Sequence, residues 1–74
     1  MDIIEKIRLK EWIENEFIKI ERINHTYHIC QIHGIYFKKT NEWISKNELI
    51  ECFIELGFDC ENNSYFDLNF KNKL

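Results

Sequence analysis

The sequence predicts a small α+β domain, in which an antiparallel sheet has helices packed on one face. Two segments repeat apolar residues at the helical period, and several others alternate apolar and polar residues as half-buried strands do. Turn signals built from Asn, Gly and Ser separate these segments. The resulting element order is αβββαββ. A chain of 74 residues is short for two cores, so we expect residues 1–74 to form a single domain.

The first half of the chain predicts one helix and three strands. The helix is expected over residues 2–15, with Asp2 as its capping residue. Its apolar residues form two clusters on different sides, which implies contacts on two sides, a bend, or an apolar patch left for a partner. The strands are expected over residues 17–23, 26–32 and 35–39. His33-Gly34 would make the turn between the last two strands, because Gly accepts a positive φ.

A second helix is the most clearly marked element. Ser45 and Glu48 form a capping box at its start, and Gly57 stands where a C-terminal glycine cap belongs. The helix is therefore expected to end near Leu56. Its apolar arc covers about half of the circumference, wider than a simple surface helix needs.

A hairpin is predicted to follow this helix, with strands over residues 58–61 and 65–70. In the second of these strands, apolar and polar residues alternate. Alternation predicts that Phe66 and Leu68 face the core, whereas Asp67 between them faces water.

Composition and charge argue against several classes of function. The formal net charge of -3 has the wrong sign for a general nucleic-acid binder. No segment approaches the roughly 18 apolar residues of a membrane helix, so no membrane partner is expected. An odd number of cysteines and an acidic N-terminal segment predict a reducing cytoplasm. Many Ile, Asn and Lys residues, without Ala, Val or Pro, indicate an AT-rich genome such as that of a low-GC bacterium, its phage or a mobile element.

Reactive side chains are concentrated in the segment HTYHICQIH, which contains His25, His28, Cys30 and His33. Imidazole and thiolate bind zinc, so these four residues are candidate ligands, with Cys60 as a further one. The other interpretation is a buried free thiol beside ordinary hydrogen-bonding histidines. We favour the second, because strand alternation would put His28 and Cys30 on one face, apart from the turn histidines. A Cys30–His28 catalytic pair lacks an orienting acid and a cleft, so neither enzyme activity nor a resident cofactor is expected.

Glutamates form the most extended charged surfaces of the predicted helices. The residues concerned are Glu48, Glu51 and Glu55 on the second helix and Glu11 and Glu14 on the first. Such surfaces meet a basic groove in a partner, as a nucleic-acid mimic does, or they are simply solvated helix faces. Trp43, in the connection before the second helix, is the better of the two tryptophans for a binding surface, because Trp is enriched at binding hot spots.

These observations together predict a non-enzymatic interaction protein from a phage or mobile element, which binds and inhibits or modulates a larger host protein or nucleoprotein complex. An anti-CRISPR-type inhibitor of a defence nuclease would suit the acidic faces. The wide and divided apolar surfaces of the helices also predict a homodimer. The alternative is a nucleic-acid-binding or transcription-regulating module, with or without zinc as a stabilising ion, in which the aromatic and basic residues of segment 36–39 contact the nucleic acid.

Overall fold

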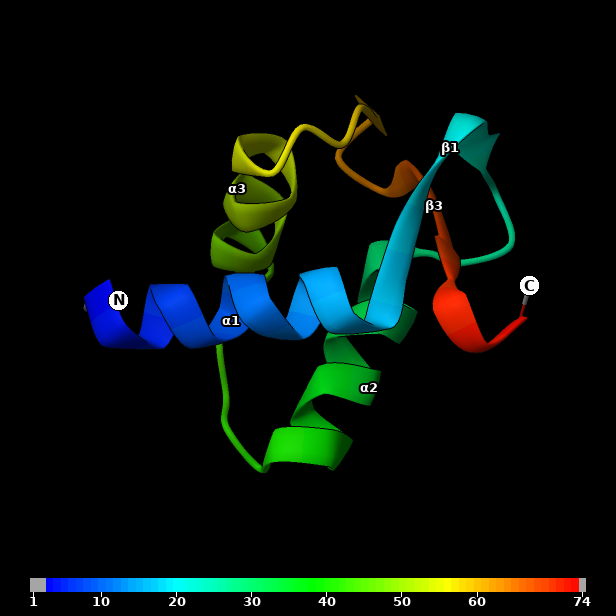
Figure 1. Ribbon diagram of the computed structural model, residues 1–74. Helices are drawn as coiled ribbons and strands as arrows, with labels where there is room; N and C mark the ends of the chain where they lie inside the picture. The colour runs from blue at the N-terminus through cyan, green and yellow to red at the C-terminus, as the bar shows by residue number, and fades with distance from the viewer. Residues whose placement is uncertain (1–2, 74) are drawn as a thin grey trace.

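The computed structural model describes residues 3–73 and shows α-helices packed on a three-stranded antiparallel sheet, which confirms the α+β class (Figure 1). Its elements in chain order are α1 (Ile3–Glu16), β1 (Phe17–Asn24), α2 (Ile29–Thr40), α3 (Lys46–Glu55), β2 (Cys60–Glu61), β3 (Tyr65–Phe70) and a final 3-10 turn, η1 (Lys71–Lys73). Asp2, the predicted capping residue of the first helix, lies outside the described residues. The observed order differs from the predicted one in the middle of the chain.

The central strand of the sheet is β3. It pairs antiparallel with β1 on one side and with β2 on the other, so the strand order is β1-β3-β2. Lys19 of β1 lies opposite Leu68, whereas Asn24 lies opposite Phe66, so β1 bulges between these two positions. A bulge in an edge strand interrupts the row of free backbone groups and opposes edge-to-edge association.

The two strands predicted over residues 26–32 and 35–39, with a turn at His33-Gly34, are wrong, because Ile29–Thr40 forms α2 and residues 26–28 before it belong to no strand. The β-branched and aromatic residues that suggested strands also fit the helical period. When α2 packs against the rest of the protein, three of them lie on its buried face. These residues, each at most 3% exposed, are Ile29, Ile32 and Tyr36.

Local hydrogen bonds mark both ends of α2. At its start, the His28 ring accepts a hydrogen bond from the Cys30 backbone N–H at 3.0 Å, while the Gln31 side chain accepts one from the His28 N–H at 2.8 Å. This reciprocal arrangement is a capping box made with histidine in place of Ser or Thr. At the other end, Asn41 adopts a left-handed conformation with φ 56° and donates its N–H to the Phe37 carbonyl. Histidine is a less familiar cap, which is why these signals did not reveal the helix.

Replacing Gly34 with alanine tests the helical assignment directly. A Cβ at Gly34 would meet nothing within 4 Å, so Gly34→Ala should raise the free energy of unfolding by about 0.5–1 kcal/mol, because Ala is the better helix former. The measurement is urea unfolding followed by circular dichroism. Gly57→Ala is the matched control, and there φ is +95°, so a loss of about 1–2 kcal/mol is expected. A destabilised Gly34→Ala variant would contradict the helix and favour the hairpin turn.

The prediction for α3 is confirmed in detail. The Ser45 hydroxyl accepts a hydrogen bond from the Glu48 N–H, and the Glu48 carboxylate accepts one from the Ser45 N–H, both at 3.1 Å. Gly57 follows the helix with a positive φ, as a C-terminal cap requires. The apolar arc of α3 faces the core through Leu49 and Phe53, both fully buried.

The predicted hairpin is also present, although β2 is only two residues long. Phe66 and Leu68 are buried as expected, but Asp67, predicted to face water, is 3% exposed.

The Asp67 carboxylate accepts the Asp59 backbone N–H at 2.8 Å and forms an ion pair with Lys19. A buried carboxylate is tolerated where such partners are present, and alternation alone does not reveal them.

No helix within residues 3–73 has the length and apolarity needed to cross a membrane.

Candidate functional site

The histidines of the HTYHICQIH segment have separate structural roles. His28 caps α2 through its ring nitrogen, so that nitrogen bonds the Cys30 backbone rather than the Cys30 thiol. His25 Nε2 lies 3.0 Å from a Glu61 carboxylate oxygen. The Tyr65 ring lies beside both, with ring centroids 5.0 Å from His25 and 5.2 Å from His28. These two histidines therefore attach the start of α2 to the β2–β3 hairpin.

His33 and Cys30 contact the segment between α2 and α3 and the start of α3. The His33 ring bonds the Ile44 carbonyl oxygen and lies edge-on to Trp43, with centroids 6.2 Å apart. The expected burial of the Cys30 thiol is wrong, because Cys30 lies on the exposed side of α2, where its thiol is 3.3 Å from the Lys46 ammonium. Across residues 3–73, no three His, Cys, Asp or Glu side chains are grouped so that they could hold a metal ion. His28 and Cys30 do not share a strand face as predicted, since His28 is the N-terminal cap of α2 and Cys30 lies in its first turn.

The predicted acidic face of α3 is largely occupied by internal contacts. Glu48 belongs to the capping box, and hydrogen bonds from the Ser45 backbone and side chain lower the pKa of its carboxyl group. Glu55 binds Lys6 at 2.8 Å and Lys10 at 2.9 Å, and the hydrogen bond to Lys6 is the main reason why the pKa of Glu55 is lowered. These contacts join α3 to α1. Of the three glutamates, Glu51 is the one left on an exposed face.

Two glutamates of α1 and the loop tryptophan remain available to a partner. Glu11 and Glu14 are exposed, and neither forms an ion pair or hydrogen bond within the described part of the chain. Trp43 is 71% exposed, which agrees with its selection as a surface residue. A tryptophan with this exposure leaves a large apolar area in water, and such residues are frequent anchors of protein interfaces.

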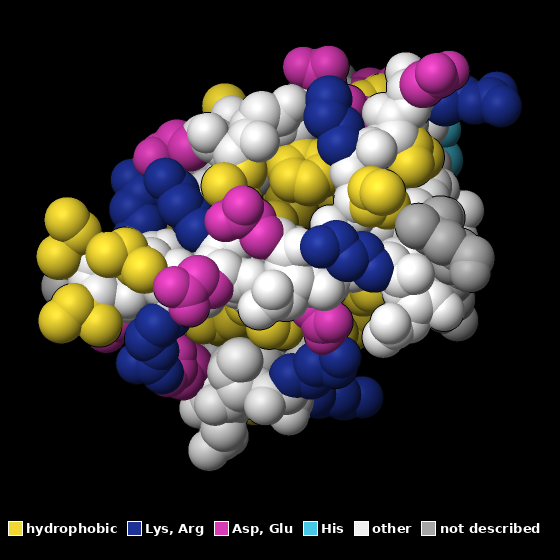
Figure 2. All heavy atoms as spheres, viewed as in Figure 1, with side chains coloured by type: hydrophobic (Ala, Val, Ile, Leu, Met, Phe, Trp, Pro, Cys, Tyr) yellow, Lys and Arg dark blue, Asp and Glu magenta, His cyan; other side chains and the backbone are white. Residues whose placement is uncertain are grey.

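The first apolar cluster of α1 is also exposed. Ile3, Ile4 and Ile7 are 74%, 65% and 50% exposed, and Figure 2 shows hydrophobic side chains gathered at the end of α1 nearest the N-terminus. The second cluster faces the core, where Leu9 and Ile13 are fully buried. Of the three explanations for two clusters, the structure agrees with an apolar patch left on the surface.

A pocket lies between α1 and the C-terminal end of α2. Its volume is about 290 Å³, and its wall consists of Arg8, Glu11, Trp12 and Asn15 from α1 together with Tyr36, Thr40 and Glu42. The four α1 residues recur at helical spacing and so share one face of that helix. The other wall was assigned to a strand and a loop in the sequence prediction. Sequence reasoning therefore missed this pocket.

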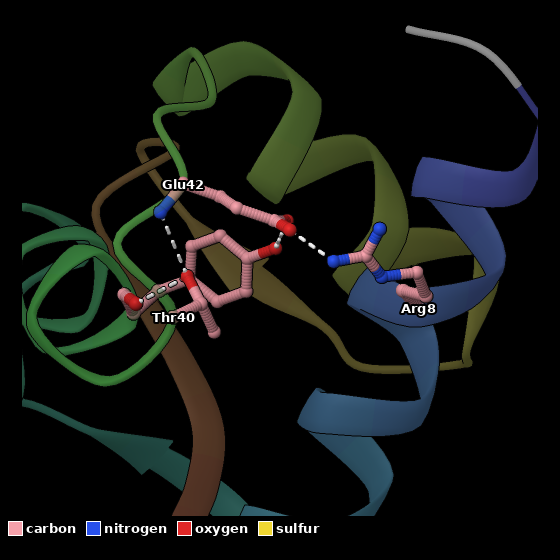
Figure 3. Close-up of polar contacts among 4 residues, drawn as sticks. Arg8, Thr40 and Glu42 are labelled. Atoms are coloured by element: carbon pink, nitrogen blue, oxygen red, sulfur yellow. Dashed lines mark hydrogen bonds and ion pairs between the residues drawn. The ribbon is translucent and has the colours of Figure 1, made fainter.

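Glu42 connects the two walls of the pocket. It forms an ion pair with Arg8, and its second carboxylate oxygen accepts the Tyr36 hydroxyl hydrogen at 3.3 Å (Figure 3). The Thr40 hydroxyl donates to the Tyr36 carbonyl at 2.8 Å and accepts the Glu42 N–H at 3.2 Å. Burial, followed by the negative charge of Glu42, raises the pKa of Tyr36. The phenol therefore remains a neutral hydrogen-bond donor near pH 7.

Trp12 contributes an aromatic ring to the pocket wall. Its ring contacts Phe17 and Tyr36 edge-on, with centroids 5.5 Å and 5.0 Å apart. Its indole Nε1 is buried and has no hydrogen-bond partner among the described residues. Buried indole N–H groups ordinarily have a partner, so the Trp12 donor is an exception.

Comparisons with protein families, curated proteins and solved structures give no match to this chain. The candidate functional features of the protein are therefore the surfaces described above. They consist of one exposed tryptophan, an exposed isoleucine patch, the exposed glutamates Glu11, Glu14 and Glu51, and the pocket between α1 and α2.

Proposed function

We propose that this protein is a small non-enzymatic interaction protein of the cytoplasm, which binds a larger host protein or nucleoprotein complex and inhibits or modulates it. The observation that carries this proposal is the 71% exposure of Trp43. The adjacent residue, Glu42, pairs with Arg8 and so ties the Trp43 loop to α1. The predicted residues that remain available to a partner are Trp43, Glu11, Glu14 and Glu51, while Glu48 and Glu55 have structural roles.

The finer proposal is an inhibitor of a defence nuclease, such as a CRISPR effector, encoded by a phage or mobile element. Two sequence features support it, namely the acidic net charge of -3 and the residue usage of an AT-rich genome. An acidic surface suits a partner that binds nucleic acid, because the partner's own groove is basic. The alternative nucleic-acid-binding function has less support, because Tyr36 is 2% exposed and cannot stack on a base.

The test is a DNA-cleavage assay with purified CRISPR effector nucleases, in which inhibition and binding are both measured. We expect Trp43→Ala to weaken binding by about thirtyfold, the loss typical of an interface hot spot of about 2 kcal/mol. Phe37→Ala is the matched control, because Phe37 is an exposed aromatic residue, 43% exposed, on α2. Its binding should be unchanged.

Either of two results would contradict these proposals. If no effector is bound or inhibited, the nuclease-inhibitor function is wrong. If Trp43→Ala and Phe37→Ala weaken binding equally, the Trp43 surface is not the interface. Native mass spectrometry of the same samples shows whether a monomer or the predicted homodimer binds, and the exposed patch of Ile3, Ile4 and Ile7 is the surface that a second copy would cover.

A further inference from the structure

We infer that the start of α2 is a pH-sensitive contact, in which protonation of His28 releases the N-terminal cap of the helix and loosens its attachment to the β2–β3 hairpin. This property belongs to the fold itself and needs no partner, so it goes beyond the proposed function. It follows from the direction of one hydrogen bond, from the charges around that bond, and from the contacts of the capped helix end.

The hydrogen bond at the cap fixes where the His28 ring carries its proton. The Cys30 backbone N–H can only donate, and it lies 3.0 Å from His28 Nδ1, so Nδ1 is the unprotonated acceptor. The neutral ring therefore carries its proton on Nε2. Protonation of the ring puts a hydrogen on Nδ1 as well, and two donors would then face each other. In this geometry the cap and a charged imidazolium exclude each other.

The charges near the start of α2 also oppose a protonated His28. A helix N-terminus has a partial positive charge, so a cation is unfavourable there. From α3, the Lys46 ammonium already lies 3.3 Å from the thiol in the first turn of α2. From the hairpin, the Glu61 carboxylate pairs with His25 rather than with His28. From β3, the Tyr65 ring lies against the His28 ring. Protonation therefore adds a positive charge beside a helix N-terminus and an ammonium group.

The capped end of α2 is also where the helix is attached to the hairpin. The Ile29 N–H donates to the Ser64 carbonyl at 2.8 Å, and the Ile29 side chain is 3% exposed. The His28 and His25 rings both lie against Tyr65, with centroids 5.2 Å and 5.0 Å away. Loss of an N-cap destabilises the helix start, so these contacts loosen with it. Histidine side chains change charge between about pH 5 and pH 8, so the change falls close to neutrality.

The stability that the cap contributes is present when His28 is neutral and is lost as the pH falls. The neighbouring pair of His25 and Glu61 responds in the opposite direction. Protonation of His25 creates an ion pair across the 3.0 Å between its Nε2 and the carboxylate, so this pair gains strength as the pH falls. The contribution of His28 is therefore measured as a difference between two proteins that share every other titrating group.

The test compares the wild type with His28→Ser. Serine is a strong N-cap that does not titrate, and with Gln31 it would form the same kind of capping box as Ser45 and Glu48. Between about pH 7.5 and about pH 5.5, where histidine gains its proton, urea unfolding is measured for both proteins. The unfolding equilibrium constant should rise about fivefold more in the wild type than in His28→Ser, the loss typical of one N-cap.

His25→Gln is the matched control, because it removes the other imidazole beside Tyr65 and leaves the His28 cap in place. Its unfolding equilibrium constant should rise at low pH at least as much as that of the wild type. A His25→Gln variant that has lost this rise would assign the pH response to His25 and overturn the inference.

NMR spectra of ¹⁵N-labelled protein report on the cap directly. Near neutral pH the His28 ring should carry its proton on Nε2, and on acidification the Cys30 amide signal should shift in step with protonation of the ring. The Glu48 amide, which is capped by the Ser45 hydroxyl, is the internal control and should not follow the ring. The inference is overturned if the neutral ring carries its proton on Nδ1, if the Cys30 amide does not follow the ring, or if the wild type and His28→Ser respond equally to pH.

Discussion

Replacing Phe53 with alanine is expected to lower the free energy of unfolding by about 3–5 kcal/mol. The Phe53 side chain is fully buried. It contacts Phe17, Phe58 and Phe66, with ring centroids 5.7, 5.4 and 4.8 Å away. One residue of α3 thus holds β1, β3 and the segment after α3 together. The substitution removes these aromatic contacts and leaves a cavity that the surrounding structure fills only in part.

This loss is large for so small a protein, because a total free energy of unfolding of about 4–11 kcal/mol is typical for 74 residues. Phe53→Ala should therefore be largely unfolded or melt far below the wild type, as judged by thermal denaturation followed by circular dichroism. Ile54→Ala is the matched control, since Ile54 is the next residue of α3 and is 50% exposed. A Phe53→Ala variant as stable as Ile54→Ala would show that the described core is wrong.

Replacing Asp67 with alanine is expected to cost about 1–3 kcal/mol of unfolding free energy. The Asp67 side chain is buried on β3, where one carboxylate oxygen accepts the Asp59 backbone N–H at 2.8 Å and the other binds the Lys19 ammonium. The residue thereby connects β1 to the chain just before β2. Alanine would leave the Asp59 N–H without its acceptor and remove the tie to β1.

The Asp67→Asn variant separates the hydrogen bond from the charge. Asparagine keeps an oxygen that can accept the Asp59 N–H, whereas it removes the negative charge opposite Lys19. The Lys19 side chain is 49% exposed and can be solvated instead, so the Asn variant should lose less stability than the Ala variant in urea unfolding. An Asn variant that loses as much as the Ala variant would assign the stability to the ion pair rather than to the hydrogen bond.

Short sequence signals, such as helix caps and turn residues, were sufficient to predict several elements of the fold. The capping box of Ser45 and Glu48 and the glycine cap at Gly57 predicted α3, because the residues that form these caps are adjacent in sequence. The turn of the final hairpin follows from Asn62 and Asn63, which both adopt positive φ, at 53° and 55°. Asparagine tolerates this conformation better than most residues.

The middle of the chain shows where the strand propensity of single residues predicts the wrong element. Ile29, Ile32 and Tyr36 favour strands as single residues, yet together they present a buried helix face to the core. The β preference of a residue depends mainly on its packing, and packing is a property of the whole fold. The error then carried over to the site, because the reason given against a zinc site and the placement of Cys30 beside His28 both relied on strand alternation.

For the candidate site, the sequence by itself determined that Trp43 and the glutamates of α1 face water, because their neighbours along the chain are polar. Only the tertiary structure decided which charges are available, since Lys6 and Lys10 reach Glu55 from another helix. It likewise brought α1 and α2 together around Trp12. The physical reason is that helical period and caps depend on neighbours along the chain, whereas ion pairs and pockets depend on contacts between distant segments.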